Sequence, residues 1–191
     1  HAGNTSTRSK LMSAGVNVQI APAGFEYSHA KYMLVDGKMA VVSSGNFNIG
    51  ALESERNYAF VTRDAEDLAD LAAIFAADWD GTAISQACTR LLVSPYNSRP
   101  RLLAHINSAQ TKLDLELFYM TDGDVVAAVK LAISRGVTVR AILTSPTDLA
   151  GNASTITMLK GLGVPVKVAK NFDLHAKLII ADGVAFIGSE N

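Results

Sequence analysis

The chain has 191 residues, of which 49% are hydrophobic and 18% charged, so it is long enough to bury the core of one or two domains. The charged fraction lies below the roughly 25% of an average globular protein, which excludes an intrinsically disordered chain. Its 17 basic and 18 acidic side chains leave a net charge of −1, so no overall positive field attracts nucleic acid or anionic lipid. Cys88 is the single cysteine, which excludes an internal disulfide and a cysteine-based zinc site.

The first third of the chain predicts a short helix ended by Gly15 and then a strand of alternating valines over residues 16–18. A second strand carries His29 and Lys31. Asp36-Gly37 is a strong hairpin signal, so the chain should return antiparallel to that strand. Apolar runs here and later fall far short of the ~18–20 residues that a membrane span needs, so no transmembrane segment is expected.

The middle of the chain alternates strand and helix patterns. Four inward positions, Leu68, Leu71, Phe75 and Trp79, define one amphipathic helix, and residues 81–88 form a linker. Phe118 and Tyr119 end a strand, where they either pack in the core or form the wall of a substrate pocket. The predicted strands are residues 55–63, 91–94, 112–119 and 137–143, and the predicted helices are residues 65–79, 100–109 and 121–135. This alternation predicts an α/β fold with a mixed sheet.

An internal repeat organises the chain. Gly3-Asn4-Thr5-Ser6-Thr7 recurs as Gly151-Asn152-Ala153-Ser154-Thr155, and the helix, glycine and valine strand follow again. We expect two half-domains: residues 1–86, the C-terminal part of the first unit, and residues 87–191, the N-terminal part of the second. Residues 88–150 have no counterpart before the first copy, and residues 47–80 have none after the second. We therefore expect this sequence to be an excerpt of a longer polypeptide.

Each unit contains one polar motif. The first motif is His29-x-Lys31-x4-Asp36-x6-Ser43-Ser44-x-Asn46, and the second is His175-x-Lys177-x4-Asp182-x5-Gly188-Ser189-x-Asn191. Residues two apart in a strand lie on one face, and the hairpin returns the serine and asparagine beside them. Each unit should therefore present an imidazole, an ammonium, a hydroxyl and an amide together. Pseudo-twofold pairing of the units would place the two sets opposite each other.

This pair of sets suits phosphoryl transfer. Two lysines and two amides can hold the oxygens of a tetrahedral anion. One histidine can attack phosphorus to form a phosphohistidine, while the other protonates the leaving oxygen and then activates the incoming nucleophile. This scheme requires no cofactor and no metal, and neither motif has the ligand clustering of a metal site.

The motif H-x-K-x4-D-x6-G-S-x-N, present twice, resembles the signature of the phospholipase D superfamily. Arg135-Gly136-Val137-x-Val139-Arg140 is similar to the helix-to-strand junction of its half-domain. The resemblance implies duplicated half-domains, each a mixed β-sheet flanked by helices, with the active site at their pseudo-twofold interface. It implies that His29 is the nucleophile and His175 the acid and base. By the same resemblance, Lys31, Lys177, Asn46 and Asn191 bind phosphate, Ser44 and Ser189 support the pocket, and Asp36 and Asp182 are structural.

Three positions depart from the pattern. Ser43 replaces the glycine of the first motif, which would crowd the backbone. The second motif has one residue fewer between Asp182 and Gly188, so either its hairpin is tighter or the return strand slips and inverts its faces. Glu55-Arg56-Asn57 stands where many members have Asn-Arg-Glu. Asn57 thus replaces a carboxylate that orients the histidine, which would weaken the His29 side.

The resemblance favours a phosphodiesterase or phosphatidyltransferase with a phospholipid substrate and water or an alcohol as acceptor. The alternatives are a nuclease of the same superfamily and a noncatalytic scaffold. A basic stripe with interleaved aromatic residues, typical of single-strand binding, is missing. Peripheral membrane contact and a nucleic-acid partner both stay open, and no targeting signal assigns a compartment.

Overall fold

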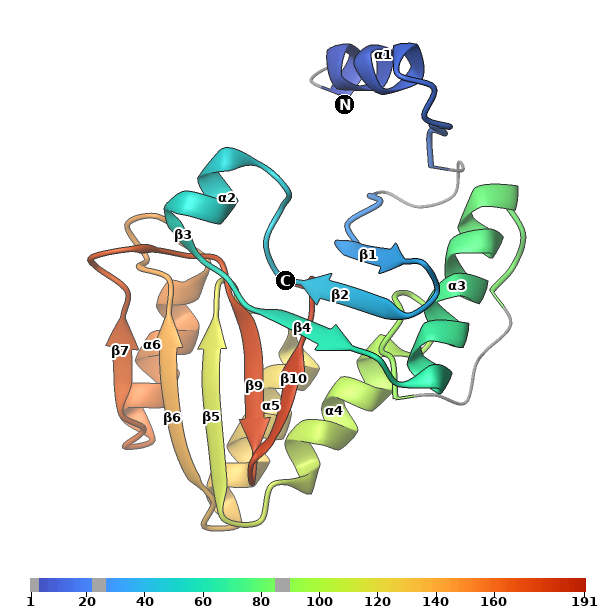
Figure 1. Ribbon diagram of the computed structural model, residues 1–191. Coiled ribbons are helices and arrows are strands. Elements are labelled where there is room, and N and C mark those ends of the chain that lie inside the picture. Colours follow the sequence, from blue (N-terminus) through green and yellow to red (C-terminus); the bar gives the residue numbers. More distant parts are fainter. Residues whose placement is uncertain (1–3, 22–26, 85–89) are drawn as a thin grey trace.

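The computed structural model describes residues 4–21, 27–84 and 90–191. Its strands form a five-stranded mixed sheet, a three-stranded antiparallel sheet and a two-stranded parallel pair (Figure 1). The predicted mixed α/β class is confirmed. In chain order the elements are α1 (Thr5–Ser13), β1 (Tyr32–Val35), β2 (Met39–Ser43), α2 (Ile49–Glu53), β3 (Glu55–Arg56), β4 (Ala59–Thr62), α3 (Ala65–Asp80), α4 (Ser98–Ser108), β5 (Lys112–Leu117), α5 (Gly123–Ser134), β6 (Thr138–Leu143), α6 (Asn152–Gly161), β7 (Val166–Val168), β8 (Asp173–Leu174), β9 (Lys177–Ala181) and β10 (Val184–Ile187).

The larger sheet has the strand order β10-β9-β5-β6-β7 and belongs to the second unit. Strands β5, β6 and β7 run parallel, whereas β9 runs antiparallel to β5. Leu113, Leu115 and Leu117 alternate along β5 and are at most 6% exposed, and they share one core with residues of α4, α5 and α6. Burying each leucine contributes about 1.5–3 kcal/mol, so this core holds β5 and β9 firmly beneath the second motif.

The smaller sheet has the order β1-β2-β4 and carries the first motif. Helix α3 begins at the Asp64 cap and packs Leu68 and Leu71 against this sheet. The prediction for Phe75 is wrong: this side chain is 50% exposed and stacks on Trp79. Ile74 takes the buried position, since it lies on the Leu71 side of the helix. None of the described helices, α3 included, is long and apolar enough to cross a membrane.

Two predicted strands do not form. Gly15 ends α1 with φ of +81°, as expected, but residues 16–18 are irregular. Their repeat counterpart, β7, pairs with β6, and residues 16–18 have no such neighbour within the described ranges. Residues 91–94 are also outside any sheet. There the backbone is held by side chains instead, since Val93 N donates to Asn97 Oδ1 at 2.8 Å.

The two motif hairpins differ in turn length but not in register. Three residues separate Val35 from its partner Met39, whereas two residues separate Ala181 from its partner Val184. In both hairpins the aspartate has positive φ, 53° at Asp36 and 47° at Asp182. The shorter spacing of the second motif is therefore taken up by a tighter turn.

Beyond each turn, the return strand pairs with the lysine of its motif at the same motif position. Ser43 N donates to Lys31 O at 2.8 Å, and Gly188 N donates to Lys177 O at 3.2 Å. Ser43 and Gly188 are the equivalent positions of the two motifs, so the predicted alternative of a slipped return strand is wrong.

Strand β3 of the first unit pairs in parallel with β8 of the second. The pairing continues where His175 N donates to Arg56 O at 3.1 Å. Tyr58 Oη adds a side-chain link between the units by donating to Glu116 Oε2 at 3.0 Å. These contacts fix the two motifs relative to each other. Gly3, Cys88, the end of the predicted linker and the predicted boundary between residues 86 and 87 lie outside the described residues.

Asp182 anchors the second hairpin to the loop before β5. Its carboxylate accepts hydrogen bonds from Thr111 Oγ1 at 2.6 Å and from the backbone N–H groups of Gln110, Thr111 and Lys112. The Thr111 hydroxyl and these N–H groups hold the pKa of Asp182 well below its ordinary value. Asp36, the equivalent residue of the first motif, makes no such contacts within the described residues.

We expect Asp182→Asn to lower the melting temperature by a few degrees and Asp36→Asn to leave it nearly unchanged. Asparagine tolerates positive φ, so the pair of variants isolates the lost acceptor contacts. Because the folded-state pKa is lowered, the contribution is complete above about pH 4 and is lost as the pH falls further. Calorimetric scans at several pH values should show the difference shrinking in acid; equal effects of the two variants would contradict the anchor role.

Candidate active site

His29 and Lys31 lie immediately before β1 at the interface of the two units. Lys31 is only 7% exposed, and its ammonium donates to His29 O at 2.6 Å. His29 Nδ1 lies 2.9 Å from Ser189 O, which belongs to the second motif. A carbonyl oxygen can only accept, so Nδ1 carries the proton and Nε2 keeps its lone pair. This imidazole is therefore held across the interface in a tautomer suited to nucleophilic attack.

His175 lies two residues before β9, and Lys177 is the first residue of that strand. Lys177 is 1% exposed, and its Nζ lies 3.0 Å from Nε2 and 3.2 Å from Nδ1 of His175. The Phe118 ring packs against both residues, 4.9 Å from the imidazole centroid and 5.2 Å from the ammonium. Phe118 is half-buried and lines a cleft beside His175, so it does not pack in the core. The ring leaves His175 and Lys177 little freedom to move.

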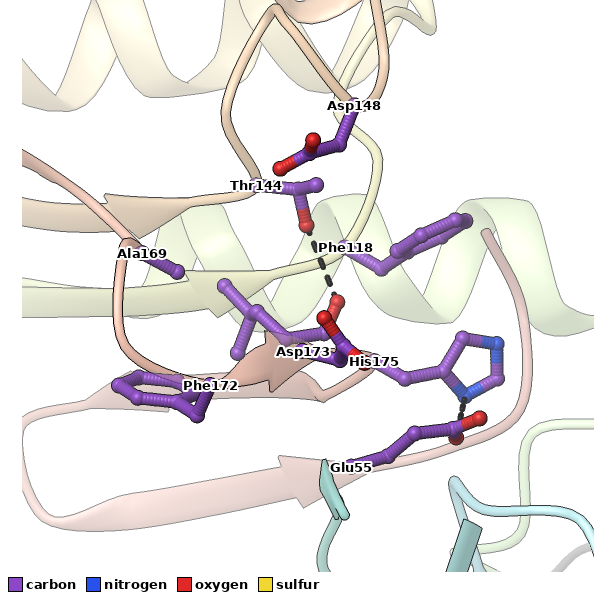
Figure 2. A pocket seen from close by; sticks show the side chains of 9 residues that line it. Glu55, Phe118, Thr144, Asp148, Ala169, Phe172, Asp173 and His175 are labelled. Carbon is purple, nitrogen blue, oxygen red and sulfur yellow. Dashed lines mark hydrogen bonds and ion pairs between the residues drawn. The ribbon is translucent and has the colours of Figure 1, made fainter. Parts of the chain in front are cut away.

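Asn57 joins the first unit to His175. Its Oδ1 accepts from Ser44 Oγ at 3.0 Å and lies 3.2 Å from His175 Nδ1. Its Nδ2 donates to Glu55 Oε2 at 3.1 Å, and that carboxylate oxygen lies 3.6 Å from His175 Nδ1 (Figure 2). The prediction that Asn57 weakens the His29 side is therefore wrong, because the amide serves the histidine of the other unit.

Glu55 is the site residue that the sequence analysis missed. The segment Glu55-Arg56-Asn57 reverses the family order, which moves the carboxylate two residues earlier. Residues two apart in an extended segment share a face, so Glu55 and Asn57 both point at His175. The swapped order was the signal that could have revealed a carboxylate still present at the site.

Ser43 is accommodated without crowding. Its hydroxyl accepts from Gly45 N at 3.0 Å, and Ser44 Oγ accepts from Tyr58 N at 3.0 Å. The close approach occurs two residues after Ser43, since a Cβ at Gly45 would lie 2.7 Å from Asn57 Cγ. Gly45 thus gives Asn57 the room to reach His175.

The remaining motif residues surround this centre. Asn46 is half-buried and Asn191 is exposed. Neither side chain donates a hydrogen bond within the described residues, so both amides are available to a ligand. Ser189 contributes its backbone carbonyl to His29. Within the described ranges, no three His, Cys, Asp or Glu side chains are grouped so that they could hold a metal ion.

The charged side chains of the two motifs interact electrostatically across the interface of the two units. Burial lowers the pKa of His29, and the ammonium groups of Lys31 and Lys177 lower it further. Burial, Lys177 and, to a smaller extent, Lys31 of the other unit lower the pKa of His175, whereas the carboxylate of Glu55 raises it. Each histidine thus senses a lysine of the other unit, as expected of a single site built from both motifs.

Both lysines are poised near neutrality. Burial lowers the pKa of Lys31 to about 8 and that of Lys177 to about 7, and the charge of Lys31 adds to the second shift. Two buried ammonium groups at close range repel each other and lack hydration. A bound anion between them would relieve both costs.

A sequence profile of the family described as "Cardiolipin synthase, PLD-like domain" matches residues 2–79 and 102–191. The chain belongs to the phospholipase D superfamily. The two matched stretches contain the two motifs and confirm the duplicated half-domains. Members of this superfamily are phosphodiesterases or phosphotransferases. No curated protein matches the sequence.

Solved structures match different parts of the chain. Polyphosphate kinase from Porphyromonas gingivalis matches 100% of the chain with a TM-score of 0.71 at 17% identity, and the chain covers 34% of it. Phosphatidylserine synthase from Haemophilus influenzae matches 81% of the chain with a TM-score of 0.54 at 14% identity, and 52% of that protein is covered. Nuc, a phospholipase D family member from Salmonella typhimurium, is 30% identical over 51% of the chain, with 67% of Nuc covered and a TM-score of 0.45. The chain thus spans between a third and two thirds of these proteins.

We expect Glu55→Gln to lower the pKa of His175 further, because the carboxylate that favours the imidazolium is lost. The pKa of His29 should stay unchanged, since its Nδ1 faces a carbonyl. NMR titration of the imidazole resonances measures both, and Glu53→Gln, an exposed carboxylate on α2, is the matched control. An unchanged pKa of His175 would contradict the role of Glu55.

We also expect sulfate affinity to fall as the pH rises from about 6.5 to 9. Over this range sulfate keeps its charge, whereas Lys177 and then Lys31 lose their protons. Calorimetric titrations at several pH values would show the decrease. Lys177→Met should weaken sulfate binding and remove the part of the decrease that occurs near pH 7. Affinity that is independent of pH would rule out these lysines as the anion site.

Proposed function

We propose that the chain carries the catalytic centre of a metal-independent phosphodiesterase or phosphatidyltransferase that acts on a phospholipid through a phosphohistidine. The observation that carries the proposal is the meeting of two His-Lys pairs from two units in one interface. Each imidazole has Nδ1 held by the other unit, His29 by Ser189 O and His175 by Asn57 Oδ1. Nε2 of His29 is thereby left for attack on phosphorus, and Nε2 of His175 lies 3.0 Å from the Lys177 ammonium, which would turn to the phosphate when a substrate binds.

The lysines and amides hold the phosphate. Lys31 and Lys177 supply two positive charges in a site largely shielded from water, where charge-assisted hydrogen bonds to anionic oxygens are strongest. Asn46 and Asn191 add neutral donors. These groups favour the transition state because charge on the equatorial oxygens grows while the donors are already in place.

In the first half-reaction, Nε2 of His29 attacks phosphorus and forms an N–P bond. The bond from phosphorus to the leaving oxygen breaks on the opposite side, and His175 transfers its Nε2 proton to that oxygen. The products are the phosphohistidine at His29 and the free alcohol. His175 is then neutral and ready to act as a base.

In the second half-reaction, His175 takes a proton from water or an acceptor alcohol. The resulting oxygen nucleophile attacks phosphorus, and the N–P bond to His29 breaks. Water gives hydrolysis and an alcohol gives transfer to a new phosphodiester. His175 ends protonated and His29 neutral, so both groups return to their starting states.

The surroundings of the two imidazoles support this assignment of roles. Nδ1 of His29 faces a neutral carbonyl, which leaves a nucleophilic neutral ring. Nδ1 of His175 lies 3.6 Å from the Glu55 carboxylate, which stabilises the imidazolium that a general acid requires. A bound phosphodiester adds another negative charge beside His175 and raises its pKa again.

A lipid substrate is supported by the family description and by the net charge of −1, which gives no long-range attraction to a polyanion. The amphiphile would be presented at a membrane surface, so we propose peripheral membrane contact. We also propose that residues 1–86 and 87–191 are the parts contributed by the two half-domains.

We expect His29→Asn and His175→Asn each to lower phospholipid turnover by at least about 10²–10⁴-fold, the usual contribution of a general acid or base. Turnover of wild-type protein on labelled phospholipid should persist in EDTA. His105→Asn is the matched control, because His105 lies on α4 outside both motifs and its ring contacts the backbone oxygen of Ile179. Circular dichroism of each variant checks that the fold is intact.

Other outcomes separate the alternatives. Full turnover in both motif variants would overturn the two-histidine assignment, and loss of all turnover in EDTA would overturn the metal-independent mechanism. Cleavage of DNA but of no lipid would identify a nuclease. A folded protein that acts on no phosphodiester would favour the scaffold.

A further inference from the structure

Glu190 lies inside the second motif, between Ser189 and Asn191, and the mechanism above does not use its carboxylate. The side chain is partly buried. Its Oε1 accepts a hydrogen bond from Ser94 Oγ at 3.2 Å, and Ser94 Oγ lies 2.7 Å from Ser98 Oγ. The carboxylate is thus directed at the segment where α4 begins and not at the two histidines.

The two serines that meet this carboxylate are themselves held firmly. Val93 N donates to Asn97 Oδ1 at 2.8 Å, and Asn97 N donates to Val93 O at 2.9 Å, so the loop that contains Ser94 is closed on itself. Ser98 is the first residue of α4, and this helix is fixed in the large core by the fully buried Ile106. The two hydroxyls therefore form a rigid anchor.

The anchor determines where the carboxylate lies. Burial raises the pKa of Glu190, whereas hydrogen bonds from Ser94 and Ser98 lower it. A carboxylate shielded from water is costly unless hydrogen bonds replace its hydration. Moving the side chain away from the two hydroxyls would remove those bonds, so it stays at the anchor.

The glycine of the second motif makes room for this arrangement. A Cβ at Gly188 would lie 2.5 Å from Phe186 Cζ and 3.0 Å from Glu190 Oε2. The carboxylate thus folds back across Gly188, beside a ring that packs on the large core. In the first motif, Ser43 stands at the position of Gly188 and Gly45 at that of Glu190. A glycine has no side chain to form a tether, so the tether belongs to the second motif alone.

The tether acts on the contact that holds the nucleophile. The carbonyl of Ser189 belongs to the peptide bond that joins Ser189 to Glu190. Its oxygen lies in one plane with the Cα of Glu190, so fixing that residue fixes the direction of the oxygen. This oxygen lies 2.9 Å from His29 Nδ1. Within the described residues, the backbone pairing of the return strand with β9 ends where Gly188 N donates to Lys177 O, so Ser189 needs another support.

We propose that Glu190 is a positioning residue that holds His29 through the carbonyl of Ser189. The proposal rests on the function proposed above, in which Nε2 of His29 attacks phosphorus. With the carbonyl in place, Nδ1 keeps the proton and Nε2 keeps its lone pair. The charges that shift the pKa of His29 are those of Lys31 and Lys177, so Glu190 acts through the backbone and not through its own charge.

The test compares Glu190→Ala with Glu190→Gln. Alanine removes the tether, whereas the glutamine amide can still accept from Ser94 and can donate to Ser98. In Glu190→Ala the pKa of His29 should fall, because the hydrogen bond to Ser189 O raises it, and the tautomer with the proton on Nε2 should gain population. In Glu190→Gln both should stay as in the wild type. NMR titration of the imidazole nitrogen resonances measures pKa and tautomer, and His175 should be unchanged in both variants.

Turnover of bis(p-nitrophenyl) phosphate gives a second measurement. We expect Glu190→Ala to lower kcat by about tenfold, the effect of losing one orienting hydrogen bond. KM should change little, since the lysines and amides that hold the phosphate are intact. Glu190→Gln should keep most of the activity. The matched control is Glu66→Ala, which removes an exposed carboxylate on α3 and should change neither kcat nor KM.

The double variant Ser94→Ala/Ser98→Ala removes the anchor and leaves Glu190 in place. It should reproduce the changes in His29, and adding Glu190→Ala to it should cause little further change, because all three substitutions break one link. This variant tests the same link when Glu190→Ala does not fold, and circular dichroism checks the fold of each.

An unchanged pKa and tautomer of His29 in Glu190→Ala and in the serine double variant would overturn the proposal. Equal shifts of His29 and His175 would overturn it too, because they indicate general loosening, and so would a shift in Glu190→Gln as large as in Glu190→Ala. The function proposed above fails separately: if His29 responds as expected but wild-type protein hydrolyses no phosphodiester, that function is wrong and the positioning of His29 stands.

Discussion

The parallel pairing of β3 with β8 is the contact on which the candidate site depends. The pairing places Glu55 opposite Asp173 and Arg56 opposite Leu174. Because the strands are parallel, the next residues, Asn57 and His175, continue side by side, and the Asn57 amide reaches the imidazole. Four residues of backbone pairing thus convert two separate motifs into one site. Without this register, the carboxylate and the amide of the first unit would have no histidine to orient.

The charges of the site explain why such a rigid frame is needed. Lys31 and Lys177 are almost completely buried, and their nearest polar contacts are backbone carbonyls and an imidazole. Unpaired buried ammonium groups destabilise a fold, and a flexible protein would turn them toward water. Here the large hydrophobic core beneath β9 and the ring of Phe118 keep Lys177 in place. Stability gained by the core therefore offsets the cost of keeping two ammonium groups buried at the interface of the two units.

Much of this arrangement follows from the sequence because its signals are local. The Asp-Gly hairpins, the alternation of Leu113, Leu115 and Leu117 and the two motifs each depend on residues close together in the chain. The facts that sequence reasoning missed depend on distant partners. Residues 16–18 have the pattern of a strand but no neighbour to pair with in the described chain. Asn57 could not be assigned to His175 without knowing that β3 pairs with β8, a contact between segments more than a hundred residues apart in sequence.

Duplication has produced two chemically different imidazoles from one motif. His29 meets a carbonyl, whereas His175 meets an amide and a carboxylate. A two-step displacement requires this difference, because one group must bind phosphorus while the other carries protons in both steps. In the mechanism proposed above, it also fixes one side of the phosphate for departure and arrival, since the leaving alcohol and the acceptor would both exchange protons with His175. In the proposed mechanism, the walls on the His175 side of the phosphate therefore determine which alcohol departs and whether water or another alcohol replaces it.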